Sequence, residues 1–380
     1  MSELDIAGAQ PIDIQRADRE LRSIWGGLAH SGEQSAEPVL RACALTLLVY
    51  LSDRSRLPEV SAALDQVAQF CPNRSILLLD DDTAPENELS AYAKLLCFLS
   101  SQSRRKLCGE QIILHAGPGR RSVLHSAAHP LIIPDIPMFL WWNHHPDFDH
   151  PTFQKLTNVA DRLIVDSDLF NRVDFDKLVE FVSRRSRPID LAVSDLNWGR
   201  LSRWRAVLAQ FYDSRLYRSH LQNLISVDIE YFTSQAARDS RKSGVLPFPV
   251  RPLLLIAWLA SRLGWKPLGE ILKDGNRYEA GFSAAGRKVT VSVTLSPVEG
   301  EQSAVGSIGL NTSDGATFVA ERASFGSFAQ ASVTLPGLPT MTRTTKLSKL
   351  DLPEILRGEL ELLDRDRVYE ETLLMASYLA

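Results

Sequence analysis

Short apolar runs alternate with amphipathic segments through the first half of the chain, and no other feature constrains the fold as strongly. The runs have the continuous apolar character of buried strands, and they read LTLLVYL, SILLL, QIILHA, MFLWW and RLIV. Segments with helical spacing of apolar residues lie between them, among them LPEVSAALDQVAQF, PTFQKLTNVA and DFDKLVEFVS. We therefore expect an α/β domain over residues 38–186, built from a mixed sheet with helices.

One segment before the third of these runs fits two structures. Apolar residues recur there at helical spacing, at Leu89, Tyr92, Leu96 and Leu99. The same segment also alternates acceptably as a strand, which would form a hairpin with the following strand and turn within SSQSRRK. Periodicity alone leaves both structures open.

The hairpin alternative makes a specific prediction for two of the four cysteines. Cys97 and Cys108 would fall opposite each other, because they are equidistant from a turn near residues 102 and 103. Directly opposed Cα atoms lie about 4.5 Å apart, which is within reach of a disulfide. A redox pair is therefore permitted, and two buried, reduced thiols are the alternative. The spacing of the four cysteines, without any CxxC pair, predicts neither a disulfide framework nor a zinc site.

The domain boundaries are expected where this pattern changes. Residues 1–37 predict an amphipathic helix that ends at Gly26 and Gly27, followed by a polar connector. After SRRSRP, residues 187–380 predict an α+β domain. NWGRLSRWRAVLAQFYD reads as one amphipathic helix, and VRPLLLIAWLASRLG as a buried helix that ends at Gly264. Short alternating segments over residues 276–350 predict an antiparallel sheet, and two closing helices follow it.

The residues offer few candidates for chemistry. The sequence contains no GxGxxG, GxxxxGK[ST], GxSxG or HExxH motif. HAGPGRR, residues 115–121, is the nearest approach to an anion-binding loop, because glycines and arginines there precede a helix. The same glycines are also required by a tight strand-to-helix turn, so both interpretations stand. NHHPDFDHP, residues 143–151, could supply metal ligands, but a solvated loop is the simpler interpretation.

Two further groups are candidates for a protein interface. Trp141 and Trp142 are adjacent, so in a strand their side chains point to opposite faces. Either both rings pack in the core, or one is exposed and contacts a partner. Arg200, Arg203 and Arg205 form a basic group that either pairs with acids on another chain or lies on a solvated helix face.

Charge and hydropathy narrow the classes of partner. The chain carries 42 basic and 46 acidic residues, a formal net charge of −4, which argues against nucleic-acid and anionic-membrane binding. The first twenty residues lack the apolar core of a secretion signal, and the run PLLLIAWLA is too short to span a bilayer. We expect a cytoplasmic protein that holds no metal or cofactor.

Several stretches together resemble one known family. They are PIDIQRADRELRSIW, RKLCGEQIILHA, LIIPDIPMFLWW, ADRLIVDS, SDLNWGRLSRWRAVLAQFYD and RPLLLIAWLASRLGW. These stretches are similar to the glucose-6-phosphate dehydrogenase assembly proteins of the OpcA type, and DLNWGRLSRWR is the most specific of them. The resemblance extends from about residue 12 to 375. NHHPDFDHP has no counterpart in it.

The resemblance implies a non-catalytic assembly factor and allosteric activator. Such a protein binds glucose-6-phosphate dehydrogenase, favours its active oligomer, and so promotes NADPH production in the oxidative pentose phosphate pathway. The family is associated with redox control of that enzyme, and it favours the strand over the helix for residues 91–99. It supplies no catalytic residues. The alternative function is a sugar-phosphate-binding α/β protein or enzyme that uses the Gly117–Arg121 loop and the arginines near residue 200.

Overall fold

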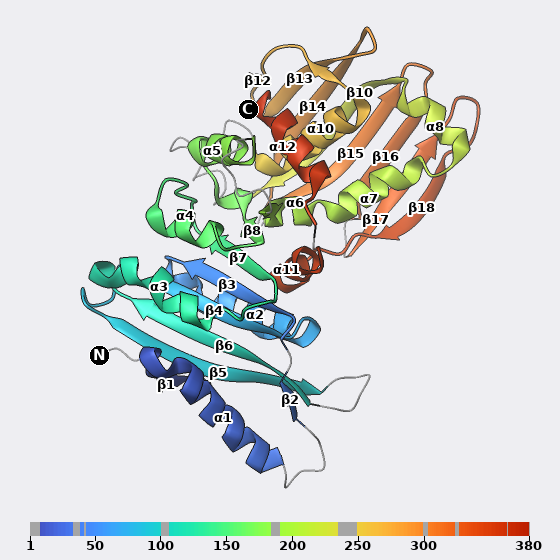
Figure 1. The fold of residues 1–380 in the computed structure, drawn as a ribbon. Coiled ribbons are helices and arrows are strands. Elements are labelled where there is room, and N and C mark those ends of the chain that lie inside the picture. The colour runs from blue at the N-terminus through green and yellow to red at the C-terminus, as the bar shows by residue number, and fades with distance from the viewer. Residues whose placement is uncertain are drawn as a thin grey trace. The chain divides into compact units, whose positions relative to one another are not determined.

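The structure, a computed structural model, describes residues 8–32, 39–41, 43–99, 106–183, 191–234, 249–298, 303–323, 327–362 and 364–379. The chain forms two compact units, each assembled from separate segments. Unit 1 comprises Met1–Asp166, Arg185–Leu196 and Asp351–Arg365. Unit 2 comprises Ser167–Arg184, Asn197–Leu350 and Asp366–Ala380. Each unit contains one large sheet (Figure 1).

The sheet of unit 1 is mixed, as the sequence predicted. Its main order is β1-β5-β6-β4-β3-β7-β8-β9, and β2 pairs with β6. Strands β6, β4, β3, β7, β8 and β9 are parallel, whereas β1, β5 and β6 pair antiparallel. The bounds are β1 Gln10–Ile12, β2 Val39–Arg41, β3 Leu45–Leu51, β4 Asn73–Asp80, β5 Leu89–Leu99, β6 Lys106–Ala116, β7 Met138–Asn143, β8 Arg162–Val165 and β9 Ala192–Asp195.

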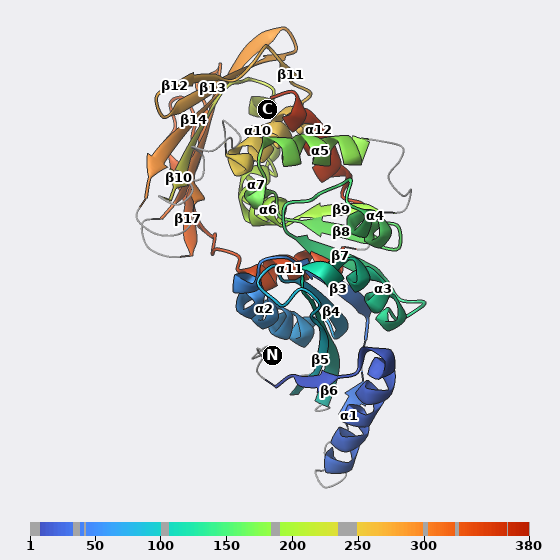
Figure 2. The ribbon, with the colours of Figure 1, turned by 90° about the vertical axis from the view of Figure 1, so that its left-hand side faces the viewer.

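The strands of this sheet are continuously apolar because helices cover both of its faces. Every residue of β3, β4, β7 and β8 is buried, which is the usual state of parallel strands. Helices α2 and α11 lie on one face, and α1 and α3 lie on the other (Figure 2). The helices of unit 1 are α1 Ala17–Gly32, α2 Leu57–Phe70, α3 Leu124–Ala128, α4 Pro151–Thr157 and α11 Leu352–Glu361.

Two local predictions for unit 1 were decided by the structure. The ambiguous segment is the strand β5, which pairs along its whole length with β6. The turn of that hairpin lies outside the described residues. The helix α1 continues past Gly26 and Gly27 to Gly32, so the predicted end of this helix was wrong. Glycine lowers helix propensity by about 1 kcal/mol, but it ends a helix only when the chain leaves the helical conformation there.

The sheet of unit 2 has the order β11-β13-β14-β10-β15-β16-β17-β18, and β12 pairs with β13. It is antiparallel, as predicted, except that β10 and β14 are parallel. The bounds are β10 Leu224–Thr233, β11 Lys266–Pro267, β12 Leu272–Asp274, β13 Arg277–Ala284, β14 Arg287–Pro297, β15 Ala304–Thr312, β16 Thr317–Arg322, β17 Phe328–Thr334 and β18 Met341–Lys346.

Helices cover one face of this second sheet. Helices α7, α10 and α12 gather on that face, and none of the described elements covers the other (Figure 2). Buried and less buried residues therefore alternate along β13 and β17. The helices of unit 2 are α5 Arg172–Ser183, α6 Leu196–Arg200 (which starts at the last residue of unit 1), α7 Ser202–Phe211, α8 Arg215–Leu221, α10 Val250–Leu263 and α12 Arg367–Ser377.

The two strongest helix patterns in the second half had different outcomes. The segment predicted as a single helix from NWGRLSRWRAVLAQFYD divides into α6 and α7 at Leu201. The helix α10 ends as predicted, with Gly264 in the left-handed conformation at φ +66°. Within the described residues, no helix has the length and apolar character needed to cross a bilayer.

Candidate functional site

The strand order of unit 1 identifies the place where a ligand site is expected. Among the parallel strands, β3 and β7 are neighbours. On the far side of β3 the sheet continues with β4 and β6, and on the far side of β7 it continues with β8 and β9. Open parallel sheets with this order bind ligands beyond the carboxyl ends of the strands at this point. Here β3 is followed by SDRSRL and β7 by HHP. The turn after β3 therefore contains no glycine, whereas a dinucleotide-binding turn needs several for close approach of a phosphate.

Side chains of the chain itself occupy this turn. Arg54 Nη1 donates to Asp81 Oδ2 at 3.0 Å, and Arg56 Nη1 donates to Asn143 Oδ1 at 2.6 Å. Asp53 accepts a hydrogen bond from the backbone N–H of Ser55 and so begins a short 3₁₀ helix, Arg54–Arg56. The two guanidinium groups are thus held by acceptors at the ends of β4 and β7. These hydrogen bonds stabilise the turn. The turn also has no glycine, so its backbone cannot approach a phosphate as closely as a glycine-rich turn does.

A buried polar cluster continues from Asp81. The carboxylate accepts from His115 Nε2 at 2.9 Å and from the backbone N–H of Thr83. Burial by itself would raise the pKa of Asp81, but hydrogen bonds from Thr83, His115 and Arg54 outweigh burial and lower it to about 2. Ser90 Oγ lies 3.5 Å from His115 Nδ1, at the outer limit of a hydrogen bond. Asp81 is ionised at neutral pH and links the ends of β4 and β6.

The neighbouring Asp80 forms a second part of this cluster. It accepts a hydrogen bond from Tyr50 Oη at 2.7 Å, and Arg121 Nε lies 3.4 Å from its other oxygen. Burial, and then the hydrogen bond to Asp80, raise the pKa of the Tyr50 phenol above its ordinary value. Tyr50 therefore keeps its proton at neutral pH and donates a hydrogen bond to Asp80, and the cluster joins three adjacent strands.

The Gly117–Arg121 loop is packed against the chain. The N–H of Gly117 donates to Glu88 O at 3.0 Å, and the N–H of Gly119 donates to Glu86 O at 2.9 Å. A Cβ at Gly117 would lie 1.9 Å from Pro85 O, so only glycine fits there. Arg121 is paired with Asp80 and Asp82. These contacts favour the steric interpretation of the glycines over the anion-binding interpretation.

The histidine-rich loop after β7 has local structural roles. His150 is the N-cap of α4, and its Nδ1 accepts from the N–H of Thr152 at 3.2 Å. Asp147 accepts from the N–H of Asp149, and its carbonyl accepts from His150, which closes a turn. In the described ranges, no three His, Cys, Asp or Glu side chains gather as metal ligands. The loop therefore offers no assembled metal site among the residues described.

Both predicted tryptophans are in the core of unit 1. Trp141 is 0% exposed and Trp142 is 2% exposed. Trp142 stacks on Tyr50 with ring centroids 3.9 Å apart and meets the edge of Phe153 at 4.9 Å. The hypothesis that one ring is exposed to a partner was wrong, because β7 is a central strand with both faces covered. The core-packing alternative describes both residues.

The three arginines near residue 200 are half-buried, and Arg203 and Arg205 contact residues of unit 2. Arg203 Nη1 donates to the carbonyl and the hydroxyl of Ser348, and Arg205 lies over the Trp198 ring, 3.3 Å from its centroid. Arg200 is at the end of α6. Arg203 and Arg205 thus have structural partners in the chain. A docking role for this group stays a prediction.

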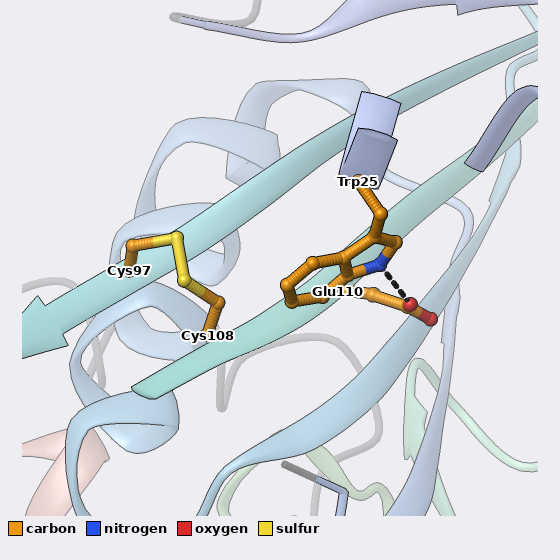
Figure 3. The surroundings of a disulfide bond; sticks show 4 residues. All are labelled: Trp25, Cys97, Cys108 and Glu110. Atoms are coloured by element: carbon orange, nitrogen blue, oxygen red, sulfur yellow. Dashed lines mark hydrogen bonds between the residues drawn. A yellow bond between two sulfur atoms is a disulfide. The ribbon is translucent and has the colours of Figure 1, made fainter. Parts of the chain in front are cut away.

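The predicted cysteine pair is joined by a disulfide. Cys97 and Cys108 are register partners in the β5–β6 hairpin, with Cα atoms 4.1 Å apart (Figure 3). The alternative of two reduced thiols does not describe this structure. Cys43 and Cys71 are free, and burial, the largest influence, raises the pKa of each thiol. A regulatory role for the disulfide stays a prediction.

A buried ion pair beside the disulfide was not predicted. Glu110 lies two residues from Cys108, so both side chains are on the same face of β6. It accepts a hydrogen bond from Arg74 Nε at 2.6 Å. It also accepts one from Trp25 Nε1 of α1 at 2.6 Å, which Figure 3 shows. The available signal was one charged residue, Arg74 or Glu110, directly or almost directly before the apolar run of each of two strands. We expect such charges to be paired whenever the strands are central.

The described geometry can be compared with known proteins. A family model described as the glucose-6-phosphate dehydrogenase subunit N-terminal domain matches residues 64–180. The corresponding model of the C-terminal domain matches residues 191–373. Among solved structures, a dehydrogenase (MviM) from Clostridium difficile is 8% identical, with a TM-score of 0.44 over 88% of this chain and 96% of its own. The transcriptional regulator Gal80p from Kluyveromyces lactis is 10% identical, with a TM-score of 0.49 over 88% of this chain and 87% of its own.

Three relatives bear the name "Putative OxPP cycle protein OpcA". The protein from Nostoc punctiforme is 31% identical over 218 residues, which is 56% of this chain and 42% of the relative. The protein from Synechocystis sp. is 28% identical over 220 residues, 57% of this chain and 42% of the relative. The protein from Synechococcus elongatus is 23% identical over 259 residues, 68% of this chain and 50% of the relative. The matched part of the chain thus spans half or less of the length of these relatives.

Proposed function

Because this chain belongs to the OpcA family of glucose-6-phosphate dehydrogenase assembly proteins, we propose that it binds glucose-6-phosphate dehydrogenase and activates it without catalysing a reaction. The proposed action is to favour the active oligomer of the enzyme and so to increase NADPH production in the oxidative pentose phosphate pathway. The observation that carries the proposal is the match of both family models, which together extend from residue 64 to 373 with a short gap.

The turn after β3 supports a role without cofactor chemistry. A dinucleotide would need a glycine-rich turn there, and the chain instead has Arg54 and Arg56 bonded to Asp81 and Asn143. The other candidate anion loop, at Gly117 and Gly119, donates its N–H groups to backbone carbonyls. At both of these turns, the groups that could bind a phosphate form hydrogen bonds within the chain instead.

Activation by binding alone needs only a difference in affinity. A partner that binds the active conformer of an enzyme tenfold more tightly than the inactive one shifts their ratio tenfold, which corresponds to about 1.4 kcal/mol. No residue of the activator has to touch the substrate. The dehydrogenase would therefore show a lower KM for glucose 6-phosphate and a larger oligomer, while the chain itself converts nothing.

The first prediction tests this function directly. Adding the purified chain at saturating concentration should lower the KM of the dehydrogenase and shift its sedimentation toward the larger oligomer. The chain alone should neither reduce NADP⁺ with glucose 6-phosphate nor bind that sugar phosphate in calorimetry. Unchanged enzyme kinetics would contradict the proposal. Micromolar binding of glucose 6-phosphate would instead favour the sugar-phosphate-binding alternative.

We also propose that the Cys97–Cys108 disulfide regulates this activation. The disulfide crosslinks the β5–β6 hairpin, and Cys108 shares a strand face with Glu110, which holds Trp25 of α1. Closing a loop of this length stabilises a fold by about 2–3 kcal/mol. Reduction should therefore loosen the hairpin and, with it, the attachment of α1.

The second prediction concerns thiols and activation together. The unfolded chain should show two free thiols after mild oxidation and four after reduction. Cys97→Ser should show three in both states, whereas the control Cys43→Ser should change from one to three. The oxidised chain should activate the dehydrogenase more strongly, and Cys97→Ser should remove that difference. An unchanged thiol count on oxidation, or equal activation by both states, would reject the switch.

A further inference from the structure

One edge of the outermost strand, β18, of the unit 2 sheet pairs with no other strand in the part of the chain that the structure describes. Among the described residues, β18 pairs only with β17. The N–H of Leu347 donates to Ser327 O, one step beyond the β17–β18 register, and this bond fixes the alternation along the strand. The N–H groups of residues 341, 343 and 345 face β17. Those of Thr342, Thr344 and Lys346 therefore point away from the sheet, and so do their carbonyls.

This edge is cationic. Arg343 and Lys346 lie on β18, and Arg215 and Arg218 lie on α8, whose Tyr217 Oη is 3.8 Å from the Sδ of Met341 on β18. Neither element contains an aspartate or glutamate. None of the four cations forms an ion pair with another described residue. Arg343 donates to Gln210 Oε1 at 3.2 Å, and Arg218 donates to the carbonyls of Tyr212 and Asp213. The carboxylate of Asp314 beside α8 pairs with His220. The chain as a whole has an acidic excess, so this concentration of unpaired positive charge is local.

Apolar side chains accompany the charges. Leu216 of α8 is 62% exposed and Met341 of β18 is 47% exposed. An exposed strand edge is the feature to which an extended segment can add as a further strand. In that mode the backbone supplies affinity, and side chains on the flanking elements select the sequence. We refer to β18 and α8 together as the cationic edge.

We propose that the cationic edge binds an extended, acidic segment of a partner protein as an additional strand beside β18. The outward N–H and C=O groups of Thr342, Thr344 and Lys346 pair with the backbone of that segment. Its carboxylates meet Arg343 and Lys346 on the strand and Arg215 and Arg218 on the helix. That the segment belongs to glucose-6-phosphate dehydrogenase rests on the proposed function.

The third prediction uses one backbone atom as the probe. Thr344→Pro removes an outward N–H and leaves every bond to β17 in place, because proline is tolerated where the N–H of an edge strand faces solvent. Thr344→Ala removes the same side chain and keeps the N–H. We expect Thr344→Pro to weaken binding of the dehydrogenase about tenfold or more, and Thr344→Ala to change it less than about twofold. Thermal unfolding of both variants checks that each is folded.

Charge reversal gives an independent measurement on the same complex. Arg343→Glu combined with Lys346→Glu should weaken binding by about tenfold to a hundredfold and reduce its salt dependence. Lys288→Glu, on the exposed end of β14 in the same sheet, is the matched control and should have little effect.

The possible results separate the two proposals. If the unaltered chain does not bind the dehydrogenase, the proposed function and this edge both fail. If it binds and Thr344→Pro binds as tightly as Thr344→Ala, the proposal of strand addition is rejected and the proposed function is not. This holds whatever the effect of charge reversal. Loss of binding in Thr344→Pro, with retention in Thr344→Ala and Lys288→Glu, supports the edge.

Discussion

Replacing Arg74 with methionine is expected to destabilise unit 1 by about 3–5 kcal/mol, because it leaves the buried carboxylate of Glu110 without its cation. Arg74 is 5% exposed and Glu110 is 3% exposed, and two of the guanidinium nitrogens lie 2.6 Å from the same carboxylate oxygen. Arg74 also donates to Leu131 O at 2.9 Å, which ties β4 to the segment before β7. Hydrogen exchange in β4 and β6, measured by mass spectrometry in increasing urea, reports the stability of this unit.

Two further variants separate charge from packing at this pair. The double change Arg74→Met with Glu110→Leu should recover most of the lost stability, because no charge is then buried alone. Arg16→Met breaks an exposed pair with Asp13 in the same unit and should change stability by less than about 1 kcal/mol. A loss for Arg74→Met no larger than that for Arg16→Met would contradict the role assigned to the buried pair.

Replacing Trp142 with alanine should destabilise unit 1 by about 3–5 kcal/mol, since a large buried ring is lost and its neighbours refill the space only in part. The ring stacks on Tyr50 and contacts the edge of Phe153, so both neighbours lose packing. Urea unfolding followed by exchange in β3 and β7 measures the effect.

A matched variant tests whether this loss concerns the core or an interface. Trp142→Phe keeps an aromatic ring against Tyr50 and should lose clearly less stability than Trp142→Ala. Binding of the dehydrogenase by Trp142→Phe should equal that of the unaltered chain, because the residue is covered by its own unit. Normal stability together with lost binding in Trp142→Ala would return this residue to the interface hypothesis.

The sequence was informative wherever a local pattern had one structural solution. Continuous apolar runs such as LTLLVYL are compatible with a buried parallel strand, and β3 is one. A pair of cysteines equidistant from a turn can only be opposed if the hairpin forms, and Cys97 and Cys108 are opposed. Gly264 ends α10 because the left-handed conformation there is easy for glycine.

The sequence was less informative about which charged and aromatic side chains reach the surface. Adjacent tryptophans in a strand point to opposite faces, but the pattern does not say whether each face is covered. Arg203 and Arg205 look like a free basic group in sequence, whereas folding brings Ser348 and Trp198 to them. The cationic edge was equally hidden, because it combines residues 215–218 with residues 341–346, which are far apart in the chain.

The sequence by itself determined most of the helices and strands, the α/β and α+β classes of the two halves, and the family, but its periodicity left residues 89–99 open between helix and strand. Only the tertiary structure decided that the turn after β3 is closed by Arg54 and Arg56, that Trp142 is internal, and that β18 has an open edge among the described residues. The physical reason is the range of the interactions. Apolar periodicity acts between residues a few positions apart, whereas burial, ion pairing and strand order depend on segments that meet only after the chain has folded.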